Sequence, residues 1–151
     1  MHGQFGEDGG IQKLLERFKV PYVGADIEAC KRWDKHIANQ FIRDNGFYAP
    51  PCALLKINQV DPKKIIDAFF KEHGITRAIV KPASGGSSIG VHSVETPAEA
   101  LEKVKLLFSR RMDTRVVIEP FCTGIEFTVI ILQNSFKMPV AILPTEIETD
   151  Y

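Results

Sequence analysis

The sequence predicts a fold of the α+β or mixed α/β class, and two observations support this prediction. Over the first two thirds of the chain, amphipathic helical segments alternate with short apolar strands, whereas strands separated by tight turns dominate after about residue 116. The chain has 151 residues, of which 44% are hydrophobic, so it is large enough for one core or for parts of two domains.

Helical periodicity and capping residues predict four helices. They cover residues 11–18, 26–45, 62–73 and 97–108. Asp61-Pro62 is a clear helix start, because a capping carboxylate is followed by proline at the first helical position. Thr96-Pro97-Ala98-Glu99 has the pattern of a capping box. Gly46 and Gly74 are expected to end the second and third helices.

Short runs of β-branched and apolar residues predict the strands. They cover residues 53–57, 78–81, 89–94, 116–119, 127–132 and 138–143. A turn is expected at Asn134-Ser135 between the last two. The Gly-rich start and the end just after a strand make both ends look cut, so we expect an internal piece of a longer protein.

Composition argues against several classes of function. The formal net charge is zero, which gives no electrostatic reason to expect nucleic acid or an anionic membrane as a partner. No apolar run approaches the roughly 20 residues that a transmembrane helix needs. The three cysteines are scattered without a C-x-x-C pair, which is typical of reduced thiols in a cytoplasmic protein and does not predict a metal site.

The strongest local motif is the segment 80–91, in which Lys81 ends an apolar strand and a loop of small residues follows. Glycines allow backbone N–H groups to approach an anion, serines add hydroxyl donors, and a lysine supplies charge for phosphate. The alternative is a plain flexible hairpin loop. The segment is not a Walker A loop, since no Gly-Lys-Ser/Thr stands at the right spacing.

Two glutamates form a second pattern, because Glu119 ends one predicted strand and Glu126 begins another. Carboxylates at strand ends can accept hydrogen bonds from ribose hydroxyls or from an adenine amino group. Solvated glutamates at the sheet edge are the simpler alternative.

Two other charged segments are ambiguous by themselves. The segment 33–36, Trp-Asp-Lys-His, is by itself typical of an exposed charged turn of a helix. The Glu7-Asp8 pair does not by itself indicate acid–base chemistry.

Taken in order, six segments resemble the D-alanine–D-alanine ligase family. They are His2-Gly3-x-x-Gly6-Glu7-Asp8-Gly9-x-x-Gln12, Pro21-Tyr22-x-Gly24, Asp34-Lys35, Val80-Lys81-Pro82, Gly86-Ser87-Ser88-x-Gly90-Val91 and Gly124-x-Glu126-Phe127-Thr128-Val129. The resemblance covers almost the whole chain, and the order and spacing of the segments are more specific than any one of them.

The resemblance implies a partial ATP-grasp fold, in which two α+β lobes close on ATP. Residues 1–33 would be the tail of the N-terminal domain, 34–118 the central domain and 119–151 the start of the C-terminal domain. It also implies ligation of two D-alanines through an acyl phosphate, for peptidoglycan precursor synthesis in the cytoplasm. ATP and Mg²⁺ would be the cofactors, D-alanine the substrate, and the parent protein a homodimer.

The resemblance also implies roles for individual residues. Its ATP-binding set comprises Lys35, Lys81, Ser87, Ser88, Glu119, Pro120, Cys122 and Glu126. The two lysines would contact the ATP phosphates, and Ser87 would also belong to a catalytic hydrogen-bond network near the first D-alanine. Glu119 would face the adenine amino group, Glu126 the ribose, and the backbone of Pro120 and Cys122 the adenine edge. His2 would lie near the first D-alanine.

Several family features are missing from the sequence, and this leaves alternatives open. The Asp, Glu and Asn that hold Mg²⁺ and the arginine that stabilises the intermediate are expected beyond Tyr151, so the chain alone is expected to be inactive. The residues that select D-alanine, D-lactate or D-serine as the second substrate are also expected there. A different ATP-grasp carboxylate–amine ligase and a non-catalytic ATP-binding module are the alternative functions.

Overall fold

The computed structural model describes residues 4–148. The chain forms two compact units, the first ending at Phe121 and the second beginning at Cys122. Strands and helices are mixed and every paired strand is antiparallel, as expected for an α+β fold. The division into residues 1–33, 34–118 and 119–151 stays a prediction.

The first unit begins with four helices. They are α1 (Gln4–Glu7), α2 (Gly10–Arg17), α3 (Ile27–Cys30) and α4 (Lys35–Asp44). The single helix predicted over 26–45 is wrong, because Asp34 has extended backbone and begins a new helix. Its carboxylate accepts a hydrogen bond from the backbone N–H of Ile37, as that of Asp26 does from Ala29 in α3. Because of this break, Lys35 is the first residue of α4.

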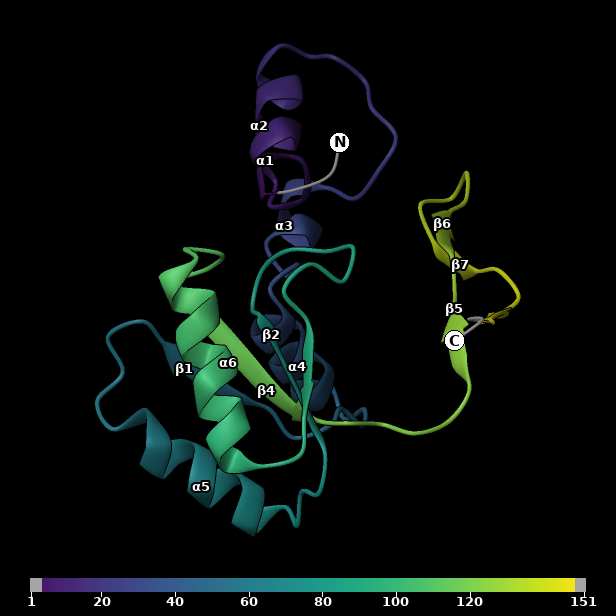
Figure 1. The fold of residues 1–151 in the computed structure, drawn as a ribbon. Coiled ribbons are helices and arrows are strands. Elements are labelled where there is room, and N and C mark those ends of the chain that lie inside the picture. Colours follow the sequence, from purple (N-terminus) through teal and green to yellow (C-terminus); the bar gives the residue numbers. More distant parts are fainter. Residues whose placement is uncertain (1–3, 149–151) are drawn as a thin grey trace. The chain divides into compact units, whose positions relative to one another are not determined.

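A four-stranded antiparallel sheet and two helices form the centre of the first unit (Figure 1). The strands are β1 (Ala53–Lys56), β2 (Ala78–Pro82), β3 (His92–Val94) and β4 (Arg115–Pro120), in the order β1-β4-β2-β3. The helices α5 (Pro62–Glu72) and α6 (Pro97–Ser109) pack on each other and against the sheet. Both helix starts are as predicted, with Asp61 and Thr96 as caps and proline next.

Strand periodicity divides the sheet into two faces. Alternate residues of β1, β2 and β4 are fully or nearly buried and form the core with α5 and α6; they are Ala53, Leu55, Ala78, Val80, Val116 and Ile118. Since side chains alternate between faces, the residues between them point to the opposite face. These include Lys81 on β2, with Arg115 and Glu119 on β4. The apolar side therefore anchors the strands, and the other side carries the polar groups.

The strand predicted over 89–94 is shorter than expected. Only β3 pairs with β2, and Ile89 lies in a turn with 66% of its side chain exposed. Two successive turns, closed by Ile89 N–H to Gly86 carbonyl at 3.2 Å and Val91 N–H to Ser88 carbonyl at 3.3 Å, occupy the start of the predicted strand. The glycine-rich loop is therefore longer than the sequence indicated.

The second unit consists of two strand pairs. The strands are β5 (Glu126–Thr128), β6 (Ile131–Gln133), β7 (Pro139–Ala141) and β8 (Thr145–Ile147); β5 pairs with β8, and β6 with β7. The single strand predicted over 127–132 is wrong, because β5 and β6 belong to different sheets. The turn at Asn134 is as expected: its carboxamide oxygen accepts hydrogen bonds from the N–H groups of Phe136 and Met138.

Candidate functional site

Two lysines from distant parts of the sequence line one cavity beside the glycine-rich loop. Lys35 at the start of α4 and Lys81 near the end of β2 border a space of about 270 Å³. Gly85, Gly86 and Ser88 of the loop line the same cavity, together with Ile79, Pro82, Ile89 and Val91. Two ammonium groups and a loop rich in small residues therefore face one space, which is the chemistry needed to hold a polyphosphate.

Lys81 forms an ion pair with Glu119, with 2.6 Å between Nζ and Oε2. The two residues share a face because β2 and β4 are antiparallel neighbours in which Ile79 is paired with Glu119. The other carboxylate oxygen of Glu119 accepts a hydrogen bond from the side-chain amide of Asn39 at 2.9 Å. Asn39 lies one helical turn after Lys35, so α4 places both residues toward the polar face of the sheet.

Lys35 is held at the cavity by contacts of both its backbone and its side chain. Its backbone N–H donates to the Ala83 carbonyl at 2.9 Å, and its ammonium group donates to the Gly85 carbonyl at 2.7 Å. Partial burial lowers the pKa of Lys35 below its ordinary value, and the positive charge of Lys81 lowers it further. A bound anion would relieve this repulsion between the two lysines.

The loop itself has an unusual backbone. Ser87 and Ser88 have φ values of 54° and 56°, the left-handed region that residues with a Cβ seldom adopt. They are the two central residues of a turn from Gly86 to Ile89, an arrangement typical of a type I′ turn. Both serines are exposed. The turn therefore places both serines at the surface of the loop.

A second cavity lies on the loop next to Ser87. It has a volume of about 320 Å³ and is lined by Glu7, Pro82, Ser84, Gly85, Gly86, Ser87, Ile89 and Met112. The short helix α1 therefore contributes a carboxylate, Glu7, to a space that Ser87 also borders. His2, which is predicted to lie near the first D-alanine, is outside the described residues.

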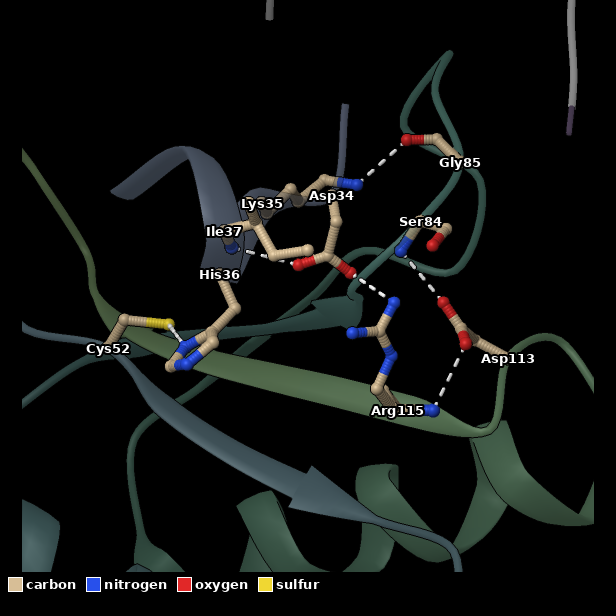
Figure 2. A network of polar contacts seen from close by, with 9 residues as sticks. All are labelled: Asp34, Lys35, His36, Ile37, Cys52, Ser84, Gly85, Asp113 and Arg115. Atoms are coloured by element: carbon tan, nitrogen blue, oxygen red, sulfur yellow. Dashed lines mark hydrogen bonds and ion pairs between the residues drawn. The ribbon is translucent and has the colours of Figure 1, made fainter. Parts of the chain in front are cut away.

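A polar network at the base of the loop was not anticipated from the sequence (Figure 2). The Asp34 carboxylate, in a residue only 5% exposed, lies 2.6 Å from the guanidinium of Arg115. Asp113 accepts from the backbone N–H of Ser84 at 2.7 Å and from that of Arg115 at 3.0 Å. The prediction of an exposed charged turn at 33–36 is therefore wrong for Asp34. The pattern of an N-cap aspartate before Lys35 was the one signal for this role.

His36 and Cys52 meet on the same side of the sheet, where Cys52 Sγ lies 3.8 Å from His36 Nδ1 (Figure 2). Burial raises the pKa of the Cys52 thiol to about 11, with a further contribution from the negative charge of Glu119. A thiol with so high a pKa is a poor nucleophile at neutral pH, so this pair does not indicate covalent catalysis.

The remaining predicted site residues lie at the end of β4 and in the second unit. Pro120 is the last residue of β4, where it pairs with Ala78. Cys122 and Glu126 are exposed residues of the second unit, and Glu126 begins β5. Within residues 4–148, no three His, Cys, Asp or Glu side chains gather as they would around a metal ion. None of the helices in that range is long and apolar enough to span a bilayer.

Both a family model and curated relatives match this chain along most of its length. Residues 43–150 match the model of a family described as D-ala D-ala ligase C-terminus. The D-alanine–D-alanine ligase of Prosthecochloris aestuarii is 38% identical over 98% of this chain, and that of Chlorobium limicola is 33% identical over 98%. The chain spans only about 40% of the length of these curated relatives.

Solved structures agree with the sequence relatives. The D-alanine–D-alanine ligase from Coxiella burnetii superimposes with a TM-score of 0.86 at 32% identity, over 97% of this chain and 42% of that one. A D-Ala:D-Ser ligase from Enterococcus faecalis has a TM-score of 0.81 at 26% identity, over 97% and 41%. The expected partial ATP-grasp fold is thereby confirmed. Both the family match and the shared fold show that this chain belongs to the D-alanine–D-alanine ligase family.

Proposed function

We propose that the chain is the ATP-binding part of a D-alanine–D-alanine ligase, which joins two D-alanines through an acyl phosphate in peptidoglycan precursor synthesis. The observation that carries the proposal is the shared cavity of Lys35, Lys81 and the glycine-rich loop. These groups come from three separate segments of the sequence. Two lysines and a loop of small residues at one cavity are what a phosphate site requires.

The two lysines would hold the phosphates of ATP. Phosphoryl transfer requires positioning and charge stabilisation more than covalent chemistry from the protein. Lys35 would gain most from the anion, because its own charge is disfavoured in the nucleotide-free chain. The loop amides around Ser87 and Ser88 would complete the cradle, with the turn presenting N–H groups and hydroxyls to the phosphates.

The other predicted residues would surround the rest of the nucleotide. Glu119 would accept from the adenine amino group, which requires its carboxylate to be shared with Lys81 and Asn39. The backbone of Pro120 and Cys122 would contact the adenine edge, and Glu126 would bind the ribose. These roles come from the family resemblance.

The first D-alanine would lie beside Ser87, in the space that Glu7 also lines. Ser87 would act in a hydrogen-bond network that orients this substrate, and His2 would lie near it. Mg²⁺ would neutralise phosphate charge, with ligands outside this chain. We propose a cytoplasmic homodimer for the whole protein.

D-lactate and D-serine are the alternatives to D-alanine as the second substrate. The likeness to a D-Ala:D-Ser ligase structure makes D-serine a specific alternative. Among the wider alternatives, a different carboxylate–amine ligase of the ATP-grasp class fits the family match less well, and a non-catalytic module that binds ATP would use the same phosphate site.

Calorimetric titration of the 151-residue chain tests the phosphate site. We expect saturable binding of a non-hydrolysable ATP analogue, and Lys35→Met should weaken it by about 1.5–3 kcal/mol, the range for a hydrogen bond to a charged group. Adenosine binding should be unchanged. Lys63→Met is the matched control, since Lys63 is an exposed lysine of α5 paired only locally with Asp67. Equal binding of the analogue by the wild type and Lys35→Met would exclude the proposed role of Lys35.

A further inference from the structure

The start of α4 and the base of the glycine-rich loop are joined by direct hydrogen bonds. The backbone N–H of Lys35 donates to the Ala83 carbonyl at 2.9 Å, and the Lys35 ammonium reaches the Gly85 carbonyl (Figure 2). Further hydrogen bonds hold the base of the loop itself.

Those contacts come from the beginning of β4. The Arg115 carbonyl accepts from the Ala83 N–H at 3.0 Å, and Asp113 accepts from the next amide, that of Ser84, at 2.7 Å. Asp113 also accepts from the backbone N–H of Arg115, which fixes the carboxylate in place. Two successive amides of the loop base are therefore bound by Arg115, the first residue of β4, and by Asp113, which lies just before that strand.

The Arg115 side chain connects β4 to the start of α4. Its guanidinium pairs with the Asp34 carboxylate at 2.6 Å, while the other oxygen of Asp34 caps α4 at the N–H of Ile37. A single carboxylate thus ties the first turn of the helix to the strand that holds the loop. Simple helix capping would need neither the arginine nor the burial of Asp34.

We propose that Asp34, Asp113 and Arg115 are positioning residues that fix Lys35 relative to the glycine-rich loop. None of the three lines the cavity that holds Lys35 and Lys81, so they act through Lys35 and the loop and not by contact with phosphate. This inference rests on the proposed function of that cavity as a phosphate site. It adds a consequence for binding: a loop base held by these contacts would need less ordering when nucleotide binds.

Two conservative substitutions test the proposal. Asp34→Asn retains a capping oxygen for α4 but removes the charge that holds Arg115. Asp113→Asn leaves one acceptor oxygen, whereas the carboxylate offers one oxygen to each of two backbone N–H groups. Asp61→Asn is the matched control, because Asp61 caps α5 through the N–H of Lys64 in the same way but belongs to none of the contacts described above that hold the loop.

Amide hydrogen exchange on the nucleotide-free chain gives the first readout. In Asp113→Asn we expect exchange of the Ser84 amide to accelerate by about tenfold or more, the change expected for loss of a hydrogen bond to a carboxylate. In Asp34→Asn the Lys35 amide should accelerate similarly. The amides of Val80 and Ile118 in the sheet should be unchanged in both variants. Unchanged exchange at the loop, or an equal acceleration in the sheet, would overturn the proposal in favour of a general contribution to stability.

Nucleotide binding gives the second readout. Both variants should raise the Kd of an ATP analogue by about tenfold while leaving the Kd of adenosine unchanged, because only the phosphates meet the displaced loop. An equal loss for both ligands would overturn the positioning role. If the wild type binds neither ligand, the proposed function fails, and the exchange results alone decide whether the three residues position the loop.

Discussion

Lys81 and Glu119 lie on neighbouring antiparallel strands, and their side chains meet at 2.6 Å on the polar face of the central sheet. Both are at least three-quarters buried as side chains. Lys81 is expected to contact the phosphates of ATP and Glu119 its adenine amino group. The ion pair therefore joins two side chains that are both expected to contact the same ligand. The proposed role of Lys81 in binding phosphate would therefore come in addition to this structural ion pair.

Replacement of Lys81 by methionine should affect both stability and binding. Loss of the ammonium leaves the buried Glu119 carboxylate without its ion-pair partner, so we expect unfolding to become easier by about 1–3 kcal/mol. Affinity for an ATP analogue should fall by about 1.5–3 kcal/mol. Denaturant melts and calorimetric titration measure the two effects separately.

The double variant Lys81→Met/Glu119→Gln separates the two roles of Lys81. Because it removes the carboxylate along with the ammonium, it should recover most of the lost stability. The affinity for inorganic triphosphate, which lacks the adenine that Glu119 is expected to contact, should stay low. Recovery of affinity together with stability would show that Lys81 is structural only.

Binding of ATP should drive proton uptake through Lys35. Burial and the charge of Lys81 lower the pKa of Lys35, so the folded chain binds fewer protons than the unfolded chain between the lowered pKa and 10.5, and the free energy of unfolding rises with pH across that window. Phosphates should raise the pKa again. Calorimetry at pH values within that window, in two buffers of different ionisation enthalpy, should detect proton uptake that Lys35→Met abolishes. Identical uptake in the variant would contradict this account.

The sequence predicted the helices and strands best where a local signal was strong. The caps at Asp61 and Thr96 and the apolar strands of the sheet were found because capping and periodicity are local properties. The break at Asp34 was missed because a second N-cap inside an amphipathic stretch leaves the periodicity intact. The pairing of β5 with β8 depends on contacts between residues far apart in the sequence, which no local pattern reveals.

The candidate site was predicted in part. Lys81 and the loop were expected together from the local motif, whereas Lys35 was expected to join them only through the family resemblance, since no spacing rule brings a helix start to a strand end. Asn39 follows Lys35 by one helical turn, a spacing that could have indicated a shared face. Asp113 and Arg115 had no comparable signal, because their role depends on the backbone of a distant loop.

Gly90 should tolerate substitution much less than Gly86. The backbone of Gly90 has a φ of 74°, and a Cβ there would lie 2.9 Å from Met112 and 3.1 Å from both Leu107 and Pro82. We expect Gly90→Ala to destabilise the chain by about 2 kcal/mol, from backbone strain and overpacking together. A Cβ at Gly86 would meet nothing within 4 Å, so Gly86→Ala is the control. Thermal melts compare them, and equal losses would refute the packing argument.

Alkylation of cysteines tests the expected contact of Cys122 with the adenine edge. Cys122 is exposed, Cys30 is buried, and the pKa of Cys52 is raised to about 11. Iodoacetamide at pH 7.5 should therefore modify Cys122 at least about tenfold faster than Cys52, because the thiolate is the reactive form and must be accessible. Mass spectrometry of digested chain measures each rate.

Nucleotide should then protect Cys122 selectively. If the backbone of Cys122 borders the adenine, saturating ATP analogue and saturating adenosine should slow its alkylation to the same extent, since both ligands carry the base. Inorganic triphosphate, which can occupy only the phosphate site, should give no protection. Protection by triphosphate alone would place Cys122 with the phosphates, and an unchanged rate with every ligand would remove it from the nucleotide site.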